Sequence, residues 1–256
     1  MATIENGPGM WELKGKRALV TGGTRGIGAA VVRQLLDAGA EVLTTARSAT
    51  SAVPEGATFV EADVRTRAGA EALAAAAQEV FGGVDVLVHN AGGAQPYKGA
   101  LAIPEEVWLD ALDLNFLASV RLDALLAPGM RERRSGAIVH VSSAAVPPTP
   151  PPFLHYTAAK AALENYSRGL AAELAPFGIR VNTVSPGRTA TPGGEATREQ
   201  WARLAGAAGQ ATNTPPLGRE GQPDDIAQAV LFLVSDRTSW LTASNLVVDG
   251  GEFPRG

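Results

Sequence analysis

The chain has 256 residues and a formal net charge of −4 at pH 7, from 22 lysines and arginines against 26 aspartates and glutamates. This length allows one or two domains, and the mild acidity, without blocks of like charge, argues against nucleic acid or an anionic membrane as a partner. The chain has no cysteine, no apolar core typical of a secretory signal and no run of about 18 apolar residues, so we expect a cytoplasmic protein without disulfides or a membrane span.

After residues 1–13, which we expect to form a loose arm, short β-branched runs alternate with longer stretches rich in alanine and leucine. The predicted strands are Arg17–Thr21, Glu41–Thr45, Thr58–Glu61, Val84–His89, Ala137–Val141, Arg180–Val184 and Leu246–Val248. The predicted helices are Gly26–Ala38, Arg67–Phe81, Pro104–Met130, Tyr156–Ala175 and Asp224–Ser235. This alternation predicts a single α/β domain over residues 14–256, with a doubly wound, seven-stranded parallel sheet and helices on both faces.

Two segments interrupt this pattern with residues that break helices and strands. Residues 144–155 include five prolines between Pro147 and Pro152, and residues 187–216 contain further prolines and glycines. Both follow predicted strands, and in an open α/β sheet the ligand crevice lies outside the carboxyl ends of the strands. We therefore expect two irregular loops that carry substrate contacts; simple connecting loops are the alternative.

A glycine-rich turn joins the first predicted strand to the first predicted helix. The spacing is Gly-x-x-x-Gly-x-Gly, in which Gly22 permits a tight turn, Gly26 lets the backbone approach a pyrophosphate and Gly28 lets the helix pack closely. The helix N-terminus offers free N–H groups to phosphates. We expect a nucleotide here; a glycine-rich turn without a ligand is the alternative. The predicted contacts in the turn are Gly22, Thr24, Arg25, Gly26, Ile27 and Gly28.

The end of the second predicted strand indicates which nucleotide binds. NAD enzymes of this architecture place an acidic residue there, whereas this strand runs into Thr45, Ala46 and Arg47. Arg47 and Arg25 can clamp a 2′-phosphate through charge-assisted hydrogen bonds. We therefore predict NADP(H) in preference to NAD(H); two solvated surface arginines are the alternative.

Tyr156 and Lys160 are four residues apart in a predicted helix and so share one face. A nearby ammonium and an oxidised nicotinamide both favour the phenolate, so we expect the pKa of Tyr156 to be lowered toward neutrality. The strand before this helix ends in Ser142 and Ser143, where a hydroxyl can hydrogen-bond a substrate carbonyl. The alternatives are a tyrosine beside a surface lysine and a serine that only caps a turn.

Together these motifs resemble the classical short-chain dehydrogenase/reductase family from about Lys14 to Gly251. The resemblance rests on TGGTRGIG at 21–28, Asp63-Val64, Asn90-Ala91-Gly92, Asn115, Ser142-Ser143, YTAAK at 156–160, Ser185-Pro186-Gly187 and Val248-Asp249-Gly250-Gly251. It implies a Rossmann-type fold and a catalytic set of Asn115, Ser143, Tyr156 and Lys160. Tyr156 would be the general acid in reduction and the general base in oxidation. Lys160 would lower its pKa and bind the nicotinamide ribose, and Asn115 would hold a water that links Lys160 to solvent.

The resemblance also implies cofactor contacts beyond the glycine turn. Asp63 would reach the adenine amino group, the Asn90–Gly92 turn would pack under the cofactor, and the backbone after Pro186 would hold the carboxamide. The implied contacts outside the glycine turn are Arg47, Asp63, Val64, Asn90, Ala91, Gly92, Tyr156, Lys160, Pro186, Gly187, Thr189 and Thr191. The chain departs from the family at Thr189, where a branched apolar residue is frequent, and at Ala243, where a glycine is frequent.

For the substrate we predict contacts with Ser143, Pro150, Phe153, His155 and Trp201, the last of these as part of a lid. The histidines show no metal-ligand spacing with one another or with carboxylates, so we expect no metal site. We expect His89 and His140 to be packed or hydrogen-bonded structural residues.

The resulting hypothesis is an NADP(H)-dependent oxidoreductase that interconverts a ketone, such as a 3-oxoacyl compound, and a secondary alcohol by hydride transfer. The alternative is a catalytically silent NADP(H)-binding sensor or scaffold on the same fold. An epimerase or dehydratase of this kind usually needs a longer chain. The helices Pro104–Met130 and Tyr156–Ala175 carry more apolar surface than one sheet face covers, and in the family they pair across a two-fold axis. We therefore predict a homotetramer, or failing that a homodimer.

Overall fold

The computed structural model describes residues 12–48, 53–206 and 214–253. Residues 1–11 of the expected arm and residues 207–213 of the second expected loop lie outside this description. Leu13, which the prediction placed in the arm, belongs to the core instead. Its side chain is buried, and its backbone N–H donates to the Ala38 carbonyl at 2.7 Å. The packed domain therefore begins one residue earlier than predicted.

Seven parallel strands form one sheet in the order β3-β2-β1-β4-β5-β6-β7. The strands are β1 (Arg17–Thr21), β2 (Glu41–Ala46), β3 (Thr58–Glu61), β4 (Val86–His89), β5 (Gly136–Val141), β6 (Ile179–Pro186) and β7 (Asn245–Val248). The doubly wound α/β fold predicted from the alternation is confirmed. The chain reverses its direction of travel across the sheet between β1 and β4, which is where ligands bind in sheets of this kind.

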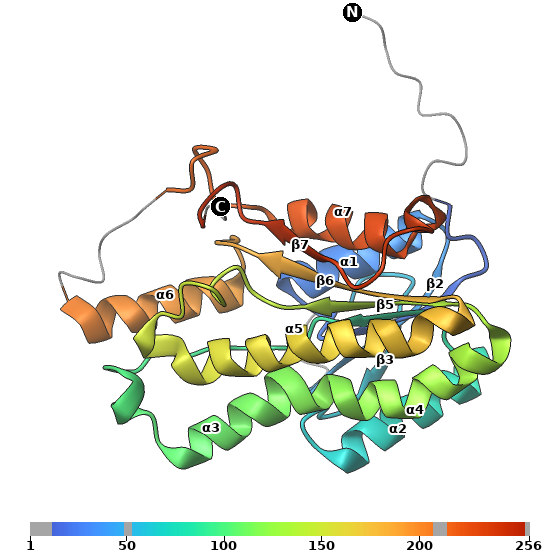
Figure 1. Ribbon diagram of the computed structural model, residues 1–256, viewed down its shortest axis with the longest axis horizontal. Coiled ribbons are helices and arrows are strands. Elements are labelled where there is room, and N and C mark those ends of the chain that lie inside the picture. Colours follow the sequence, from blue (N-terminus) through green and yellow to red (C-terminus); the bar gives the residue numbers. More distant parts are fainter. Residues whose placement is uncertain (1–11, 49–52, 207–213, 254–256) are drawn as a thin grey trace, which may run out of the picture.

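Helices cover both faces of the sheet (Figure 1). On one face lie α1 (Gly26–Asp37) and α7 (Pro223–Val234), and on the other lie α2 (Arg67–Phe81), α4 (Ala118–Arg133) and α5 (Leu154–Leu174). The strands supply alternate side chains to the two faces: in β1, Val20 packs under α1 while Leu19 packs on the side of α2 and α4. Burial on both faces explains the apolar character of the central strands.

The predicted helix Pro104–Met130 is not one regular α-helix. The structure has α3 (Glu105–Leu112), a π-helical turn η2 (Asp113–Leu117) and then α4. A π-turn bonds each N–H five residues back and widens the helix locally, a feature frequent at functional sites. Asn115 sits in this turn, where its side chain donates to the Ala111 carbonyl at 3.1 Å. The apolar spacing of the sequence could not reveal this local change of pitch.

The expectation of an irregular loop over residues 187–216 is wrong in its middle part, where the structure has α6 (Pro192–Ala205). Thr191 caps this helix by accepting a hydrogen bond from the Gly194 N–H at 3.0 Å, and Pro192 occupies the first turn, where its missing N–H costs nothing. Prolines and glycines that suggested a loop therefore mark a helix start. Short 3₁₀ turns complete the described elements: η1 (Ala100–Ala102), η3 (Pro151–Phe153), η4 (Ala175–Phe177) and η6 (Asp236–Thr238).

Within the described part of the chain, no helix has both the length and the apolar composition needed to cross a bilayer.

Candidate active site

A cavity of about 910 Å³ lies at the carboxyl ends of the strands, walled by the segments that follow β1 to β6. Every residue that the sequence singled out for cofactor, catalysis or substrate lines this cavity, from Arg47 after β2 to Trp201 on α6. The volume is in the range that suits a cofactor-sized ligand. The topology therefore gathers residues from distant parts of the sequence into one site, although what each of them does remains a prediction.

The glycine turn has backbone geometry that only glycine adopts easily. Gly22 and Gly26 have φ angles of +68° and +54°, in the left-handed region. A Cβ on Gly28 would overlap the Gly22 carbonyl and the Asn90 amide, so Gly28 lets α1 close onto its own turn. Gly23, which the spacing did not single out, has no room for a Cβ because the Thr44 side chain lies against it. The turn is therefore tightly packed at Gly23 and Gly28, and its other side lines the cavity.

The turn after β4 is fastened to the glycine turn. The Asn90 side-chain amide donates to the carbonyls of Thr21 and Gly22 at 3.0 and 3.1 Å, and the backbone N–H groups of Asn90 and Ala91 both donate to the Thr21 hydroxyl at 3.0 Å. These bonds hold the two turns together on one side of the cavity. Asn90 therefore joins the two turns, an arrangement that agrees with the expected packing of Asn90–Gly92 under a cofactor.

Arg25 and Arg47 are exposed at the cavity edge, and beside them lies an arginine that the sequence analysis missed. Arg65 binds the Asp63 carboxylate at 2.7 Å and the Asp110 carboxylate at 2.8 Å. The Arg65 hydrogen bond is the main cause that lowers the pKa of Asp63, with a smaller contribution from the Arg47 charge. Asp63 therefore stays ionised, and a carboxylate with four lone-pair sites can still accept a bond from an adenine amino group. Arg65 could have been found from the sequence because it directly follows the Asp63-Val64 motif.

Tyr156 lies half-buried at the cavity wall, at the start of α5, near the Ser143 side chain. Burial raises the pKa of Tyr156, and the neighbouring Ser143 side chain opposes that shift. The expectation of a lowered pKa is therefore wrong for the protein alone. Burial, which disfavours the charged phenolate, raises the pKa by more than the neighbouring Ser143 lowers it. Ser143 is buried after β5, and its Oγ also accepts a bond from the Ala145 N–H at 3.2 Å.

Lys160 is buried one helical turn after Tyr156, and its Nζ donates to the Val141 carbonyl at 2.7 Å. Nζ lies 6.0 Å from the centre of the Tyr156 ring. Asn115 is also buried, and its Oδ1 accepts from the Gly93 N–H at 3.1 Å. Both Nζ and this Oδ1 lie against Gly92, where a Cβ would come within 3.3 and 3.0 Å of them. The four predicted catalytic residues thus converge on one part of the cavity.

The four residues predicted to contact only the substrate also lie around this end. The rings of Phe153 and Trp201 lie 6.2 Å apart, centroid to centroid, and are tilted by 54°, so the proline-rich segment contacts α6. Pro150 lines the same cavity. His155 is buried, and its Nδ1 has no hydrogen-bond partner among the residues that the structure describes. α6 is tied down from the other side, since the Thr197 hydroxyl donates to the Ala94 carbonyl at 3.0 Å.

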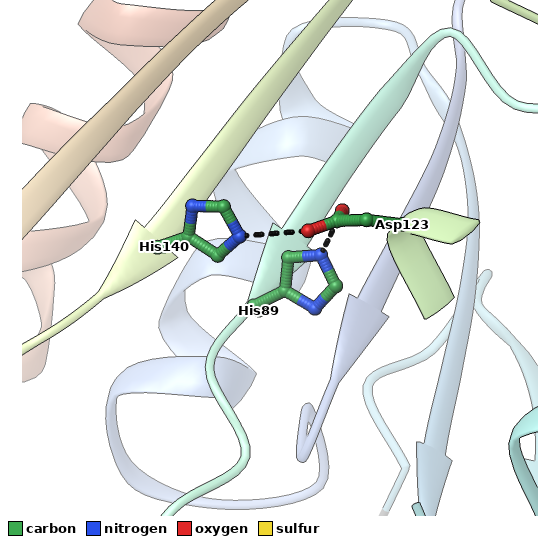
Figure 2. A group of neighbouring side chains, drawn as sticks. All are labelled: His89, Asp123 and His140. Carbon is green, nitrogen blue, oxygen red and sulfur yellow. Dashed lines mark hydrogen bonds and ion pairs between the residues drawn. The ribbon is translucent and has the colours of Figure 1, made fainter. Parts of the chain in front are cut away.

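Three side chains with no shared spacing in the sequence meet in the core between β4, β5 and α4 (Figure 2). His89 donates to one Asp123 oxygen at 2.8 Å and His140 donates to the other at 3.1 Å. The expectation that His89 and His140 are packed or hydrogen-bonded structural residues is therefore confirmed. The rings are stacked at 4.8 Å within 10° of parallel, so their nitrogens point side by side at separate oxygens. This geometry suits a hydrogen-bonded cluster better than ligands converging on one ion.

Comparisons with known proteins cover nearly the whole chain. The family model described as "Enoyl-(Acyl carrier protein) reductase" matches residues 22–252. The 3-oxoacyl-[acyl-carrier-protein] reductase FabG of Vibrio cholerae is 35% identical over 250 residues, which are 94% of this chain and 98% of that protein. The L-rhamnose 1-dehydrogenase (NAD(P)(+)) of Azotobacter vinelandii is 37% identical, over 93% of this chain and 96% of that protein.

A solved structure agrees with the fold. L-sorbose reductase of Gluconobacter frateurii, complexed with NADPH and L-sorbose, superposes with a TM-score of 0.86 at 30% identity, over 94% of this chain and 98% of that one. The sheet order, the gathered site and the matches over almost the full length lead to one conclusion: this chain is an oxidoreductase of the classical short-chain dehydrogenase/reductase family.

Proposed function

We propose that this protein is an NADP(H)-dependent reductase that interconverts a ketone and a secondary alcohol, with Tyr156 as the general acid in reduction. The observation that carries the proposal is the placement of Tyr156, Ser143 and the buried Lys160 on one wall of the cavity, with the Lys160 Nζ 6.0 Å from the centre of the Tyr156 ring. A phenol and a serine hydroxyl side by side can both hydrogen-bond one carbonyl oxygen, which is where negative charge develops during reduction.

When bound, NADPH supplies the hydride, and the residues of this chain handle the proton. The raised pKa of Tyr156 keeps the phenol protonated at neutral pH, the form that a general acid needs. Ser143 orients the substrate oxygen toward that phenol. Lys160 holds a positive charge below the ring, which favours the phenolate left behind once the proton has moved.

The preference for NADPH rests on charge at the cavity edge. Arg25 and Arg47 are exposed there, and no carboxylate stands at the end of β2, where NAD enzymes use one for the ribose hydroxyls. The glycine turn fits a nucleotide because its positive φ angles keep the backbone open where side chains would intrude. L-sorbose reductase, which resembles this chain over its whole length, has NADPH bound.

For the substrate we propose a neutral, moderately hydrophobic carbonyl compound. Pro150, Phe153 and Trp201 give the substrate end apolar and aromatic walls. The relatives named above act on acyl-carrier-protein thioesters and sugars, so both classes belong in the test set.

The test measures NADPH and NADH oxidation by the purified protein with 3-oxoacyl thioesters, polyketide-type ketones, steroids and ketoses. We expect turnover with at least one class and a lower KM for NADPH than for NADH. NADPH binding without turnover on any class would favour the silent sensor or scaffold. Equal or better performance with NADH would overturn the assignment of the two arginines.

A further inference from the structure

Burial of Lys160 disfavours the charged form of its side chain. The side chain is only 3% exposed, and its hydrogen bond with the Val141 carbonyl involves a neutral acceptor. Burial lowers the pKa of Lys160 to about 8, while the nearby Glu164 carboxylate raises it. A lysine this close to losing its proton at neutral pH is sensitive to any charge beside it.

Glu164 stands one turn further along α5, on the same face as Lys160. Its Oε1 accepts a hydrogen bond from the Ser142 hydroxyl at 2.7 Å and lies 3.3 Å from the Ser185 hydroxyl. Ser142 directly precedes Ser143, and Ser185 directly precedes Pro186 at the end of β6. The Ser185 hydroxyl makes its shorter hydrogen bond, at 2.8 Å, to Asn245 Oδ1, so the Glu164 carboxylate is held mainly by Ser142 at the end of β5.

We propose that Glu164 is a positioning residue of the active site: one helical turn from Lys160 and held at the β5 end by Ser142, it places a negative charge beside the buried Lys160 ammonium. This inference rests on the proposed function in one respect, the participation of Lys160 in the reaction.

The other titratable groups around Lys160 cannot replace that negative charge. Tyr156 is a protonated phenol at neutral pH. His140, on β5, interacts electrostatically with Lys160, but burial lowers the pKa of His140 and keeps it neutral. Behind His140, the Asp123 carboxylate accepts hydrogen bonds from His140 and His89 and is separated from Lys160 by the His140 ring. Among the described residues, Glu164 is the carboxylate whose charge raises the pKa of Lys160.

The experiment titrates Lys160 directly in the protein without substrate. The chain has four lysines, Lys14, Lys16, Lys98 and Lys160, so NMR of protein labelled with ¹³C at the lysine ε-carbon gives few signals, and the one lost in Lys160→Arg belongs to Lys160. We expect Glu164→Gln to lower the titration midpoint of Lys160 by about one pH unit. Glu164→Asp, which shortens the side chain by one methylene, should lower the Lys160 midpoint by less. This variant replaces Glu164→Gln in the test if the glutamine variant does not fold.

Two controls separate charge from structure. Glu173→Gln removes an exposed carboxylate from the same helix and should leave the midpoint unchanged. Ser185→Ala removes a neighbour of Glu164 but keeps the charge, and should not lower the midpoint. A folded Glu164→Gln protein whose Lys160 midpoint equals that of the wild type would overturn the proposal. Because no substrate is present, a chain inactive on every carbonyl compound would refute the proposed function and leave this titration as it is.

Discussion

Arg47 occupies the position at the end of β2 where an acidic residue would exclude a 2′-phosphate by like-charge repulsion. Its guanidinium is exposed at the cavity edge, so it can turn toward a ligand without breaking the core. Arg65 differs, because Asp63 and Asp110 already hold it. The proposed preference for NADPH therefore depends on Arg25 and Arg47, which are exposed at the cavity edge, more than on Arg65.

Arg47→Ala should weaken NADPH binding and leave NADH binding within about twofold. A charge-assisted hydrogen bond is worth about 1.5–3 kcal/mol, which corresponds to a loss of about 10- to 100-fold in NADPH affinity. Fluorescence titration with each cofactor measures this, and Arg33→Ala, on the exposed side of α1 away from the cavity, is the matched control. Unchanged NADPH affinity in Arg47→Ala would assign the 2′-phosphate to other residues.

Gly28 and Gly169 are both helical glycines with opposite surroundings. A Cβ on Gly28 would overlap the Gly22 carbonyl and the Asn90 amide, whereas a Cβ on Gly169 meets nothing within 4 Å. Gly28→Ala should therefore lower the free energy of unfolding by about 1–3 kcal/mol and weaken NADPH binding. Gly169→Ala should raise stability by about 0.5–1 kcal/mol and leave binding as it was. Urea unfolding and cofactor titration of both variants provide the check; similar behaviour of the two would mean that the turn tolerates side chains.

Among the elements, those with strong apolar periodicity could be predicted from the sequence. α2 has the bounds predicted for it, and β1 and β3 also begin and end as expected. α6 was missed because Pro192, Gly193 and Gly194 at its start suggested a loop, although Thr191-Pro192 is a typical helix start. The residues that line the site could be named from motifs, but their protonation depends on burial. For this reason the pKa of Tyr156 is raised in the protein without cofactor, whereas the expected lowering counted on an oxidised nicotinamide beside it.

The His89–Asp123–His140 cluster depends on contacts between elements and has no signal along the chain. It ties β4 and β5 to α4, and the second nitrogen of His140 lies 3.1 Å from the Ser167 hydroxyl on α5. These are the elements that carry Asn90, Ser143 and Lys160. Burial and the Asp123 carboxylate also raise the pKa of Tyr166, which packs edge-on against the His140 ring. The cluster is therefore a polar core beneath the site.

This cluster predicts acid-sensitive stability. Burial holds the pKa of His140 below its ordinary value of 6.5, and burial does the same for His155. Because the unfolded chain then binds more protons than the folded one, stability is full above pH 6.5 and falls as the pH drops below it, by up to about 1.4 kcal/mol per pH unit for each histidine. Urea unfolding between pH 5 and 8 measures the slope, which His140→Asn should reduce. A flat profile over this range would contradict the assigned neutral form of His140.

At the scale of the whole molecule, one sheet lies between two layers of helices (Figure 1), and the cavity sits at the carboxyl ends of its strands. Several large apolar side chains are nevertheless exposed on the protein surface. Trp240 is 99% exposed, and Leu125 on α4 and Leu109 on α3 are also exposed. These side chains are available for contacts with further copies of the chain.

We predict a homotetramer, or failing that a homodimer, at micromolar concentration. Burial of Trp240 in an interface would contribute through its large apolar area, so Trp240→Glu should weaken association, whereas Glu173→Gln should not. Sedimentation velocity of the three proteins decides the matter. A wild-type protein that sediments only as a monomer would refute the prediction and leave the exposed tryptophan unexplained.

The catalytic role of Tyr156 is tested most directly by Tyr156→Phe, assayed with a carbonyl substrate found in the screen described above. Phenylalanine keeps the ring and removes only the hydroxyl near Ser143. We expect kcat to fall by about 10²- to 10⁴-fold, the usual contribution of a general acid, while the dissociation constant for NADPH stays within about threefold of the wild type. Full turnover by the phenylalanine variant would show that the proton comes from another group.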